Sequence, residues 1–521
     1  MAHLTQEHVQ QLYREFGELA VIDDIIRHRA ADNPPAPILA YPRTPRSVDD
    51  YEKFTGKQLN QFVDGAVKYF LSHGLRPNTH EVVAILASSN VDFIVTFFAL
   101  SRLGYTVLCL SLRIPDVAIV ELLKQAQCHT IVREESPFVA ANIEAVQKIW
   151  HLNELSIPKR VYYDREDLVH EQPFVRDYDA AQERDRVALI MHSSGSTGLP
   201  KVVSLTHRNV LTHAVQGAGM DNFAALPLYH MYGVSTTMQA MYRRKTAHLF
   251  NTSLPLTADN ILAALAAVNV RVIHAVPYAL GLIAEQPRGM EYLKSCKIVT
   301  AAGARTPDEL GDRLVASGVN LGVVFGTTEA GLVGDSMRRE EGDDSWDYIR
   351  IYSNVRKYVT MYPIGDNQFE CVYLQGHPGL STWNSDDPEP RCWHSKDIFT
   401  PHPTIPDIWK YVTRIDDRIT LVNGEKVLPL PIEGRMRDHD LVREAVVVGV
   451  DRPIPGLLLF RSEASSSLSP SSFLEAIWPA VEQANLRAEG FSQITREMIC
   501  HHPRAGVQDV RGRDRRHVRA T

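Results

Sequence analysis

Cysteine is scarce in this chain of 521 residues, and its distribution excludes two classes of site. The six cysteines stand singly in the sequence, at Cys109, Cys128, Cys296, Cys371, Cys392 and Cys500. Without a Cys-x-x-Cys pair, neither a cysteine-based zinc site nor a disulfide framework is expected. Isolated cysteines are typical of a reducing compartment, so we expect a cytoplasmic protein.

Long hydrophobic runs are missing as well. The longest apolar stretch, around Phe93 to Leu100, is far shorter than the ~20 residues that cross a bilayer. The first twenty residues alternate between polar and apolar types and contain no signal-peptide core. We therefore expect no membrane partner.

The chain also lacks an excess of positive charge. Its formal net charge is -7, and its sequence pI is about 6.3. An acidic protein is poorly suited to a polyphosphate backbone, so we expect no nucleic-acid partner. Local basic sites for a single nucleotide are compatible with this charge.

What the sequence does contain is the pattern of a soluble α/β protein. Apolar residues make up 44% of the chain, and 521 residues are enough for two or more domains. The apolar run Val82–Ala87 predicts a buried strand, and Tyr105–Leu110 predicts a second one. Between them, residues 91–103 predict a helix that Asn90 caps and Gly104 ends. Strand, helix and strand at this spacing predict a βαβ unit in a parallel sheet.

The last fifth of the chain has a different pattern. Ala445–Val450 and Leu457–Phe460 predict the strands of a hairpin. Ser472 and Glu475 form a capping-box pattern ahead of a helix that Pro479 is expected to kink. We expect a small α+β domain here.

Residues 193–201, SSGSTGLPK, carry the strongest signal for chemistry. They lie between the apolar runs Val187–Met191 and Val202–Leu205. Backbone N–H groups, hydroxyls and one cation in such a loop suit phosphate oxygens. The loop is neither GxxxxGK[ST] nor GxGxxG. Because no GxGxxG follows the early strand, a dinucleotide-dependent oxidoreductase is disfavoured.

This loop resembles the phosphate loop of the acyl-adenylate-forming, or AMP-binding, superfamily. That superfamily includes acyl-CoA synthetases, luciferases and the adenylation domains of nonribosomal peptide synthetases. Five further segments resemble its motifs in the same order, at Leu226–Gly233, Phe325–Glu329, Trp393–Asp397, Tyr411–Asp417 and Asn423–Glu433. Residues 424–433 and 488–491 are most similar to fungal enzymes of the peptide-synthetase-like type.

The resemblance implies the architecture and the domain boundary. The superfamily has a large multi-sheet α/β body and a small mobile α+β domain after a hinge. Tyr411–Asp417 resembles that hinge, with Thr413 in place of a glycine. We therefore expect a large adenylation domain over residues 1–415 and a small domain over 416–521, with the hinge near 416.

The resemblance also implies ATP and Mg²⁺ as cofactors and assigns roles around them. The residues expected to hold the β- and γ-phosphates are Ser193, Ser194, Gly195, Ser196, Thr197, Gly198 and Lys201. Those expected at the rest of the nucleotide are Phe325 stacked on adenine, Thr328 at the α-phosphate, and Asp397 with Arg414 at the ribose hydroxyls. Glu329 is expected to bind Mg²⁺, which prefers carboxylate and phosphate oxygens.

His230 is expected at the pocket for a small carboxylic acid, and we count it with Lys201, Thr328 and Glu329 as catalytic. Relatives that activate amino acids place an aspartate nearby for the α-ammonium. Here Met231 or an uncharged neighbour occupies that place. A buried ammonium without a carboxylate is costly, so an aryl or other non-amino acid is favoured.

The expected function is activation of this acid and its transfer to a thiol, either coenzyme A or a carrier protein's phosphopantetheine, in secondary metabolism. A stand-alone acyl-CoA ligase is one alternative. A catalytically impaired nucleotide- or acid-binding remnant is another, because relatives carry a C-terminal lysine whereas the last lysine here is Lys426. The tail, residues 500–521, is rich in arginine and lacks apolar periodicity. A shifted reading frame or misplaced splice site is favoured over a genuine basic tail, and no carrier-domain serine motif occurs.

Overall fold

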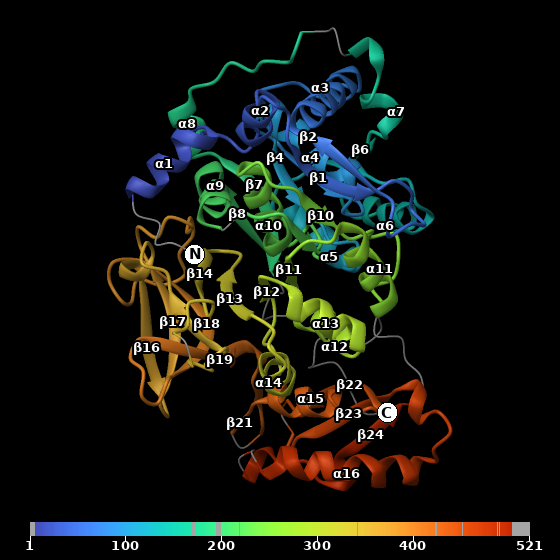
Figure 1. Ribbon diagram of the computed structural model, residues 1–521, viewed down its shortest axis with the longest axis vertical. Coiled ribbons are helices and arrows are strands. Elements are labelled where there is room, and N and C mark those ends of the chain that lie inside the picture. Colours follow the sequence, from blue (N-terminus) through green and yellow to red (C-terminus); the bar gives the residue numbers. More distant parts are fainter. Residues whose placement is uncertain are drawn as a thin grey trace.

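The protein has a large α/β body and a smaller domain below it in the view of Figure 1. The computed structural model describes residues 6–168, 172–193, 200–217, 219–340, 342–422, 425–450, 452–486, 488 and 490–502. Two large sheets form the body, and helices cover them, so the expected α/β class is confirmed. Among the described residues, no helix combines the length and apolar character needed to cross a bilayer. All six cysteines are free.

The first sheet has six strands in the order β6-β5-β3-β4-β7-β8. Their bounds are Val82–Leu86 (β3), Thr106–Cys109 (β4), Thr130–Arg133 (β5), Asn153–Ser156 (β6), Val187–Ser193 (β7) and Lys201–Thr206 (β8). All neighbours are parallel except β7 and β8, which form an antiparallel pair. The predicted βαβ unit is therefore confirmed. Asn90 Oδ1 accepts a hydrogen bond from the N–H of Phe93 at 3.0 Å, and Gly104 ends the helix with φ of 91°.

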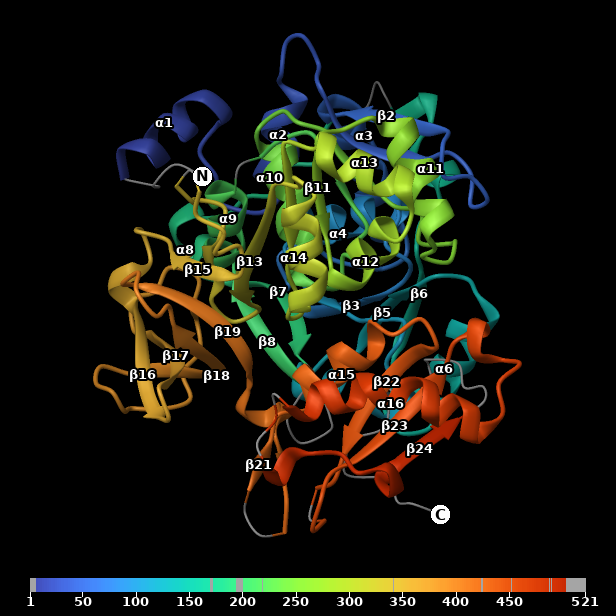
Figure 2. The same cartoon turned by 60° about the horizontal axis from the view of Figure 1, so that its bottom comes forward.

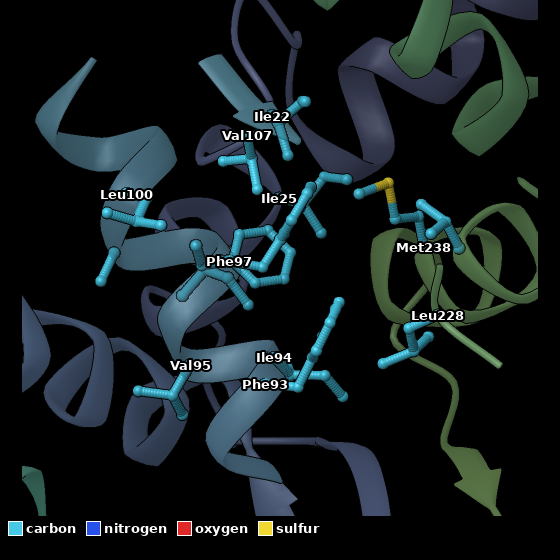
Figure 3. Packing of buried hydrophobic residues seen from close by; sticks show 14 of the residues in the cluster. Ile22, Ile25, Phe93, Ile94, Val95, Phe97, Leu100, Val107, Leu228 and Met238 are labelled. Atoms are coloured by element: carbon cyan, nitrogen blue, oxygen red, sulfur yellow. The ribbon is translucent and has the colours of Figure 1, made fainter. Parts of the chain in front are cut away.

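The helices of the body pack on both sheets (Figure 1). Their bounds are Gln6–Phe16 (α1), Asp24–Ala30 (α2), Gly56–Ser72 (α3), Val91–Leu103 (α4), Asp116–Gln125 (α5), Pro137–Gln147 (α6), Arg160–Tyr163 (α7), Ala180–Arg184 (α8), His207–Gln216 (α9), Met231–Tyr242 (α10), Ala258–Val268 (α11), Pro277–Ala284 (α12), Pro287–Ser295 (α13) and Asp308–Ala316 (α14). In Figure 3, side chains of α4 such as Phe93 and Phe97 lie close to Ile25 of α2. Residues far apart in the sequence thus share one core.

The second sheet has thirteen strands and changes character at β13. Its order is β16-β17-β18-β19-β15-β14-β13-β12-β11-β9-β10-β1-β2. The bounds are Pro37–Pro42 (β1), Tyr51–Thr55 (β2), Asn222–Ala224 (β9), Ala247–Leu249 (β10), Val272–Ala275 (β11), Ile298–Ala301 (β12), Leu321–Thr327 (β13), Gly331–Asp335 (β14), Tyr348–Ile351 (β15), Val359–Gly365 (β16), Gln368–Leu374 (β17), Cys392–Pro401 (β18) and Ile408–Arg414 (β19). Strand β13 is parallel to β12 and antiparallel to β14. The strands from β14 to β16 form the yellow and orange part at the left of Figure 1.

The small domain begins beyond β19 and has its own core. Its elements are Ile419–Thr420 (β20), Lys426–Val427 (β21), Pro429–Arg437 (α15), Val442–Val448 (β22), Gly456–Arg461 (β23), Pro470–Leu486 (α16) and Ile499–His502 (β24). The predicted hairpin corresponds to β22 and β23, and β24 adds to it in parallel. Phe473, Ile477 and Val481 of α16 are buried against this sheet.

The predicted capping box at the start of α16 is wrong. The helix begins at Pro470, so Ser472 lies inside its first turn. The Oγ of Ser469 accepts a hydrogen bond from the N–H of Ser472 at 3.1 Å and caps the helix instead. Proline is favoured in the first helical turn because it needs no N–H partner there, and this moves the start three residues earlier. Pro479 lies within a helix that continues to Leu486.

The small domain, orange and red in Figure 2, contacts the body where α15 comes near α14. Arg435 Nη2 of α15 lies 2.7 Å from Glu309 Oε1 in the first turn of α14. Asp438, which follows α15, faces the same Glu309. Burial and the hydrogen bond to the Glu309 carboxyl raise the pKa of Asp438 to about 7, although the charges of Arg313 and Arg435 oppose this.

We predict that this interface weakens as the pH rises from about 4 to about 7. An aspartate with a raised pKa stabilises the contact while it is protonated, and this contribution is lost as the pH passes its pKa in the docked state. Asp438→Asn should remove most of the pH dependence, whereas Asp440→Asn, an exposed control on the same loop, should leave it. Small-angle scattering and limited proteolysis at pH 5 and pH 8 measure the docking. Equal docking of the unmodified chain at both pH values would contradict the prediction.

Candidate active site

Strands β18 and β19 bring Asp397 and Arg414 together as direct cross-strand partners. Asp397 is buried, and its backbone N–H donates to the Oγ of Ser395 at 3.0 Å. Arg414 places Nε 3.7 Å from Asp397 Oδ1, and its Nη2 donates to the backbone carbonyl of Ser395 at 3.3 Å. The pair therefore has a fixed position at the end of β19, immediately before the chain enters the small domain.

Phe325 lies near the end of β13 and joins an aromatic cluster with these same strands. Its ring centroid is 4.8 Å from that of Phe399 on β18, edge to face, and 6.2 Å from that of Tyr411 on β19. Phe325 is half-buried, so part of its ring stays accessible. The cluster fixes a planar apolar surface beside Asp397.

Thr328 and Glu329 occupy the turn between β13 and β14. The Oγ1 of Thr327 accepts a hydrogen bond from the N–H of Ala330 at 3.1 Å, which closes the turn. Burial raises the pKa of Glu329, and its own backbone N–H, the charge of Arg414 and the Thr327 hydroxyl oppose the rise. The structure thus brings Glu329 close to Arg414, although 85 residues separate them in the sequence.

Two glycines allow this turn to form. A Cβ atom on Gly326 would lie 2.5 Å from the carbonyl oxygen of Gly331. Gly331 itself has φ of 80°, and the buried ring of His213 fills the space where its Cβ would be. Burial lowers the pKa of His213 to about 4, so this ring is neutral. A side chain at Gly326 would collide with the backbone of β14, and one at Gly331 would collide with the ring of His213 on α9.

The phosphate-loop segment is a β-hairpin whose tip lies outside the described residues. Ser193 ends β7 and pairs with Lys201, the first residue of β8. Lys201 is exposed and Ser193 is half-buried. The predicted phosphate ligands Ser194, Gly195, Ser196, Thr197 and Gly198 all fall in the undescribed tip. The hairpin is tied to the loop after β17, because Ser381 Oγ donates to the carbonyl of Ser204 at 2.7 Å.

His230 precedes α10 and lies next to a second histidine that the sequence did not single out. Its ring centroid is 4.9 Å from that of Tyr229 and 6.4 Å from that of His192. His192 directly precedes Ser193, and its Nε2 accepts a hydrogen bond from the N–H of Ser111 at 3.3 Å. Burial and the neighbouring His230 lower the pKa of His192 to about 4. Burial and Arg113 also lower the pKa of His230, whose outer edge is exposed. The two rings lie between α10 and the β7–β8 hairpin, which we call the phosphate hairpin.

A pocket lies between α10 and the strands β9 to β14. The lining residues are Gly219, Met220, Asn222, Tyr232, Ser235, Thr236, Gln239, Val272, His274, Ile298, Thr300, Val324, Leu332 and Met337. None of them is Asp, Glu, Lys or Arg. Burial lowers the pKa of His274 to about 4 and raises the pKa of Tyr232, so both side chains are neutral near pH 7. The described wall of this pocket therefore carries no charge.

Tyr232, Thr300 and His274 form a hydrogen-bonded group inside the pocket. The Oγ1 of Thr300 lies 2.7 Å from the hydroxyl of Tyr232 and 2.7 Å from Nδ1 of His274. The sequence placed Met231 or an uncharged neighbour at the substrate, and of these residues Met231 is buried in the main hydrophobic core. The next residue, Tyr232, reaches the pocket instead, because consecutive helix residues point about 100° apart.

Strand β13 joins the pocket, the aromatic cluster and the Glu329 turn. Val324 lines the pocket, Phe325 belongs to the aromatic cluster, and Glu329 follows in the turn. Among the described residues, no group of three or more His, Cys, Asp or Glu side chains could hold a metal ion alone. Glu329 fits a Mg²⁺ ion whose other ligands come from phosphate and water, because its carboxylate is desolvated and feels the positive charge of Arg414, which opposes the rise of its pKa.

Two family models match the chain. The AMP-binding enzyme model matches residues 26–356, and the C-terminal domain model of the same enzymes matches residues 416–511. The chain belongs to the AMP-binding enzyme family. It is thus an adenylate-forming enzyme, similar to fungal peptide-synthetase-like enzymes.

Two AMP-binding relatives illustrate that similarity. The chain is 28% identical over 473 residues to the adenylate-forming reductase Nps11 of Serpula lacrymans, covering 82% of this chain and 42% of the relative. It is 25% identical over 523 residues to a carboxylic acid reductase of Neurospora crassa, covering 94% and 48%. The chain therefore spans less than half the length of these relatives.

Solved structures of AMP-binding proteins share the fold. An anthranilate CoA ligase in complex with anthranoyl-AMP superposes with a TM-score of 0.71 at 15% identity, covering 93% of both chains. The o-succinylbenzoate coenzyme A synthetase of Bacillus subtilis, in complex with ATP and magnesium, gives a TM-score of 0.69 at 17% identity, covering 92% of this chain and 96% of that chain.

We predict that Lys201→Ala and Glu329→Gln each weaken binding of ATP with Mg²⁺ at least ~10-fold, about 1.4 kcal/mol. The first change removes a cation from the phosphate hairpin, and the second removes a carboxylate charge while keeping its shape. Lys148→Ala, at the exposed residue that follows α6, is the control because Lys148 pairs at the surface with Glu144. Calorimetry measures the affinities. If both variants matched the unmodified chain, the nucleotide would bind elsewhere.

Proposed function

We propose that this chain uses ATP to convert a small non-amino carboxylic acid into an acyl-adenylate for transfer to a thiol. One observation supports the proposal: strand β13 contributes residues both to the uncharged pocket and to the group of Phe325, Asp397 and Arg414, which we call the nucleotide cluster. Val324 and Phe325, which are adjacent in the sequence, belong to the two regions. An acid in the pocket would present its carboxylate to the Glu329 turn.

In the proposed reaction, a carboxylate oxygen attacks the α-phosphorus of ATP, the bond to the β-phosphate oxygen breaks, and pyrophosphate leaves. Lys201 and Ser193 would hold the β- and γ-phosphates, Asp397 with Arg414 the ribose, and Phe325 the adenine ring. Thr328 would donate a hydrogen bond to the α-phosphate. Mg²⁺ at Glu329 would neutralise phosphate charge. His230 is not among the residues that line the pocket, and it would act beside the β7–β8 hairpin, near His192, as a neutral ring whose pKa is lowered.

The second proposed step is attack of a thiolate on the acyl carbon, which releases AMP. Coenzyme A and a carrier protein's phosphopantetheine carry the same reactive thiol. The fungal relatives named as reductases favour a carrier domain, whereas the structural likeness to CoA ligases favours free coenzyme A. Acid-dependent exchange between ATP and labelled pyrophosphate tests the first step across a panel of acids. No exchange with any acid would leave nucleotide or acid binding without catalysis as the function.

We predict that 3-phenylpropanoate binds at least ~10-fold more tightly than phenylalanine in the presence of a non-hydrolysable ATP analogue. The two ligands share the ring and the chain length and differ by the α-ammonium. The described pocket wall has no carboxylate for that ammonium, and an unpaired buried cation is costly. Thermal shift titrations give the two affinities. A preference for phenylalanine would contradict the proposed substrate class.

We predict that the chain forms adenylate slowly, because residues 427–521 contain no lysine. Relatives use a C-terminal lysine near both reacting groups, so its loss should affect the step of attack more than ATP affinity. Replacing residues 500–521 with a family-like ending should raise adenylate formation roughly 100-fold or more, about 2.7 kcal/mol. The same ending with alanine in place of its lysine is the control. Fast turnover by the unmodified chain would disprove this, and no gain from the lysine would favour a non-catalytic remnant.

A further inference from the structure

The pocket has two tiers of side chains, which the strand register defines. Val272 of β11 pairs with Ile298 of β12, and His274 pairs with Thr300. Ile273 pairs with Phe223 of β9, which places Asn222 level with Val272. Because alternate strand residues face the same side, Val272 and Ile298 form one tier and His274 and Thr300 the next, about 7 Å further along.

The tier that contains Asn222 is the one farther from the nucleotide cluster. The parallel strands β11, β12 and β13 end at the same edge of the sheet, and Glu329 follows β13 at that edge. His274 and Thr300 lie nearer to this edge than Asn222 does. An acid whose carboxylate faces Glu329 would therefore direct its opposite end toward Asn222.

The amide of Asn222 leaves one buried acceptor open. Its side chain is 1% exposed, and Nδ2 donates to the carbonyl of Met220 at 3.1 Å and to that of Thr236 at 3.5 Å. Two carbonyl partners fix the orientation, because a flipped amide would turn its oxygen toward them. Among the described residues, nothing donates to Asn222 Oδ1. A buried acceptor without a donor is costly, which points to a donor supplied from outside the chain.

Several other polar side chains of the pocket already have partners. Tyr232 and His274 both contact the hydroxyl of Thr300 at 2.7 Å. Gln239 Nε2 donates to the backbone carbonyl of His213 at 3.2 Å. On the sheet side, the tier of Asn222 is otherwise apolar, with Val272 and Ile298 as its walls. A ligand that reaches this tier must therefore be apolar along its length and carry a donor at its end.

We infer that Asn222 is a specificity-determining residue that accepts a hydrogen bond from a hydroxyl or amino group on the end of the acid remote from its carboxylate. The substrate class is then a hydroxyaryl or aminoaryl carboxylic acid. A rigid ring spans the two tiers with apolar edges and places its substituent at a fixed depth. The inference rests on the proposed function, because it requires the acid to lie in this pocket with its carboxylate toward ATP.

The test uses stable mimics of the acyl-adenylate, so it does not depend on turnover. Calorimetry compares the acyl-sulfamoyl adenosines of benzoate, of 3- and 4-hydroxybenzoate, and of the two corresponding methyl ethers. We expect one hydroxy compound to bind at least ~10-fold more tightly than both its methyl ether and the unsubstituted compound. In Asn222→Leu, which keeps the size and removes the acceptor, this preference should disappear. In Asn320→Leu, an exposed asparagine ahead of β13, it should remain.

The outcomes separate the two claims. Binding of all five compounds within about twofold would overturn the role of Asn222 while supporting the proposed function. A preference that persists in Asn222→Leu would assign the recognition to another residue and overturn the inference. Binding by none of them to the unmodified chain would remove the proposed function, and the inference with it. Asn222→Leu could fail to fold. In that case, comparing each hydroxy compound with its methyl ether on the unmodified chain still decides whether the protein recognises the hydroxyl as a hydrogen-bond donor.

Discussion

The close approach of β13 and β14 is the constraint on which the rest of the site depends. Gly326 leaves no room for a Cβ against β14, Gly331 leaves none against His213 of α9, and the turn between the two strands carries Thr328 and Glu329. At the same strand the sheet changes from parallel to antiparallel pairing. The parallel side supplies the walls of a pocket, and the antiparallel side supplies Asp397 and Arg414. A wider turn would separate these regions and move Glu329 away from Arg414.

Much of the fold could be predicted from the sequence where local signals agree with one another. The unit β3–α4–β4 follows from apolar runs, an asparagine cap and a terminal glycine, all of which the structure shows. The start of α16 could not be predicted in this way, because several serines stand near one another and any of them could cap a helix. The choice of Ser469 over Ser472 depends on where Pro470 enters the helix. Competing local signals are therefore resolved by the packing of the whole helix.

The residues of the candidate site also fall into two groups, those that the sequence identified and those that it missed. Motif resemblance pointed to Phe325, Glu329, Asp397 and Arg414, and the structure brings these four together from two distant segments. Asn222 has no motif, and its position depends on the register of β9 against β11, which composition and periodicity do not specify. His192, His274 and Thr300 were missed for this reason as well. Residues that contact a common substrate group can share a motif, whereas residues that line a pocket share only a place in the sheet.

The small domain docks near the same edge of the sheet as the Glu329 turn. Helix α14 starts after the end of β12, so Glu309 in its first turn lies toward the edge of the sheet where Glu329 also lies. Arg435 and Asp438 of the small domain meet Glu309 there, and Lys396 Nζ lies 3.0 Å from Asp416 Oδ1 at the junction of the domains. The described contacts of the small domain with the body thus include charged and titratable groups, while the described wall of the pocket is uncharged. Changes in charge can therefore alter the position of the small domain without altering the residues that select the acid.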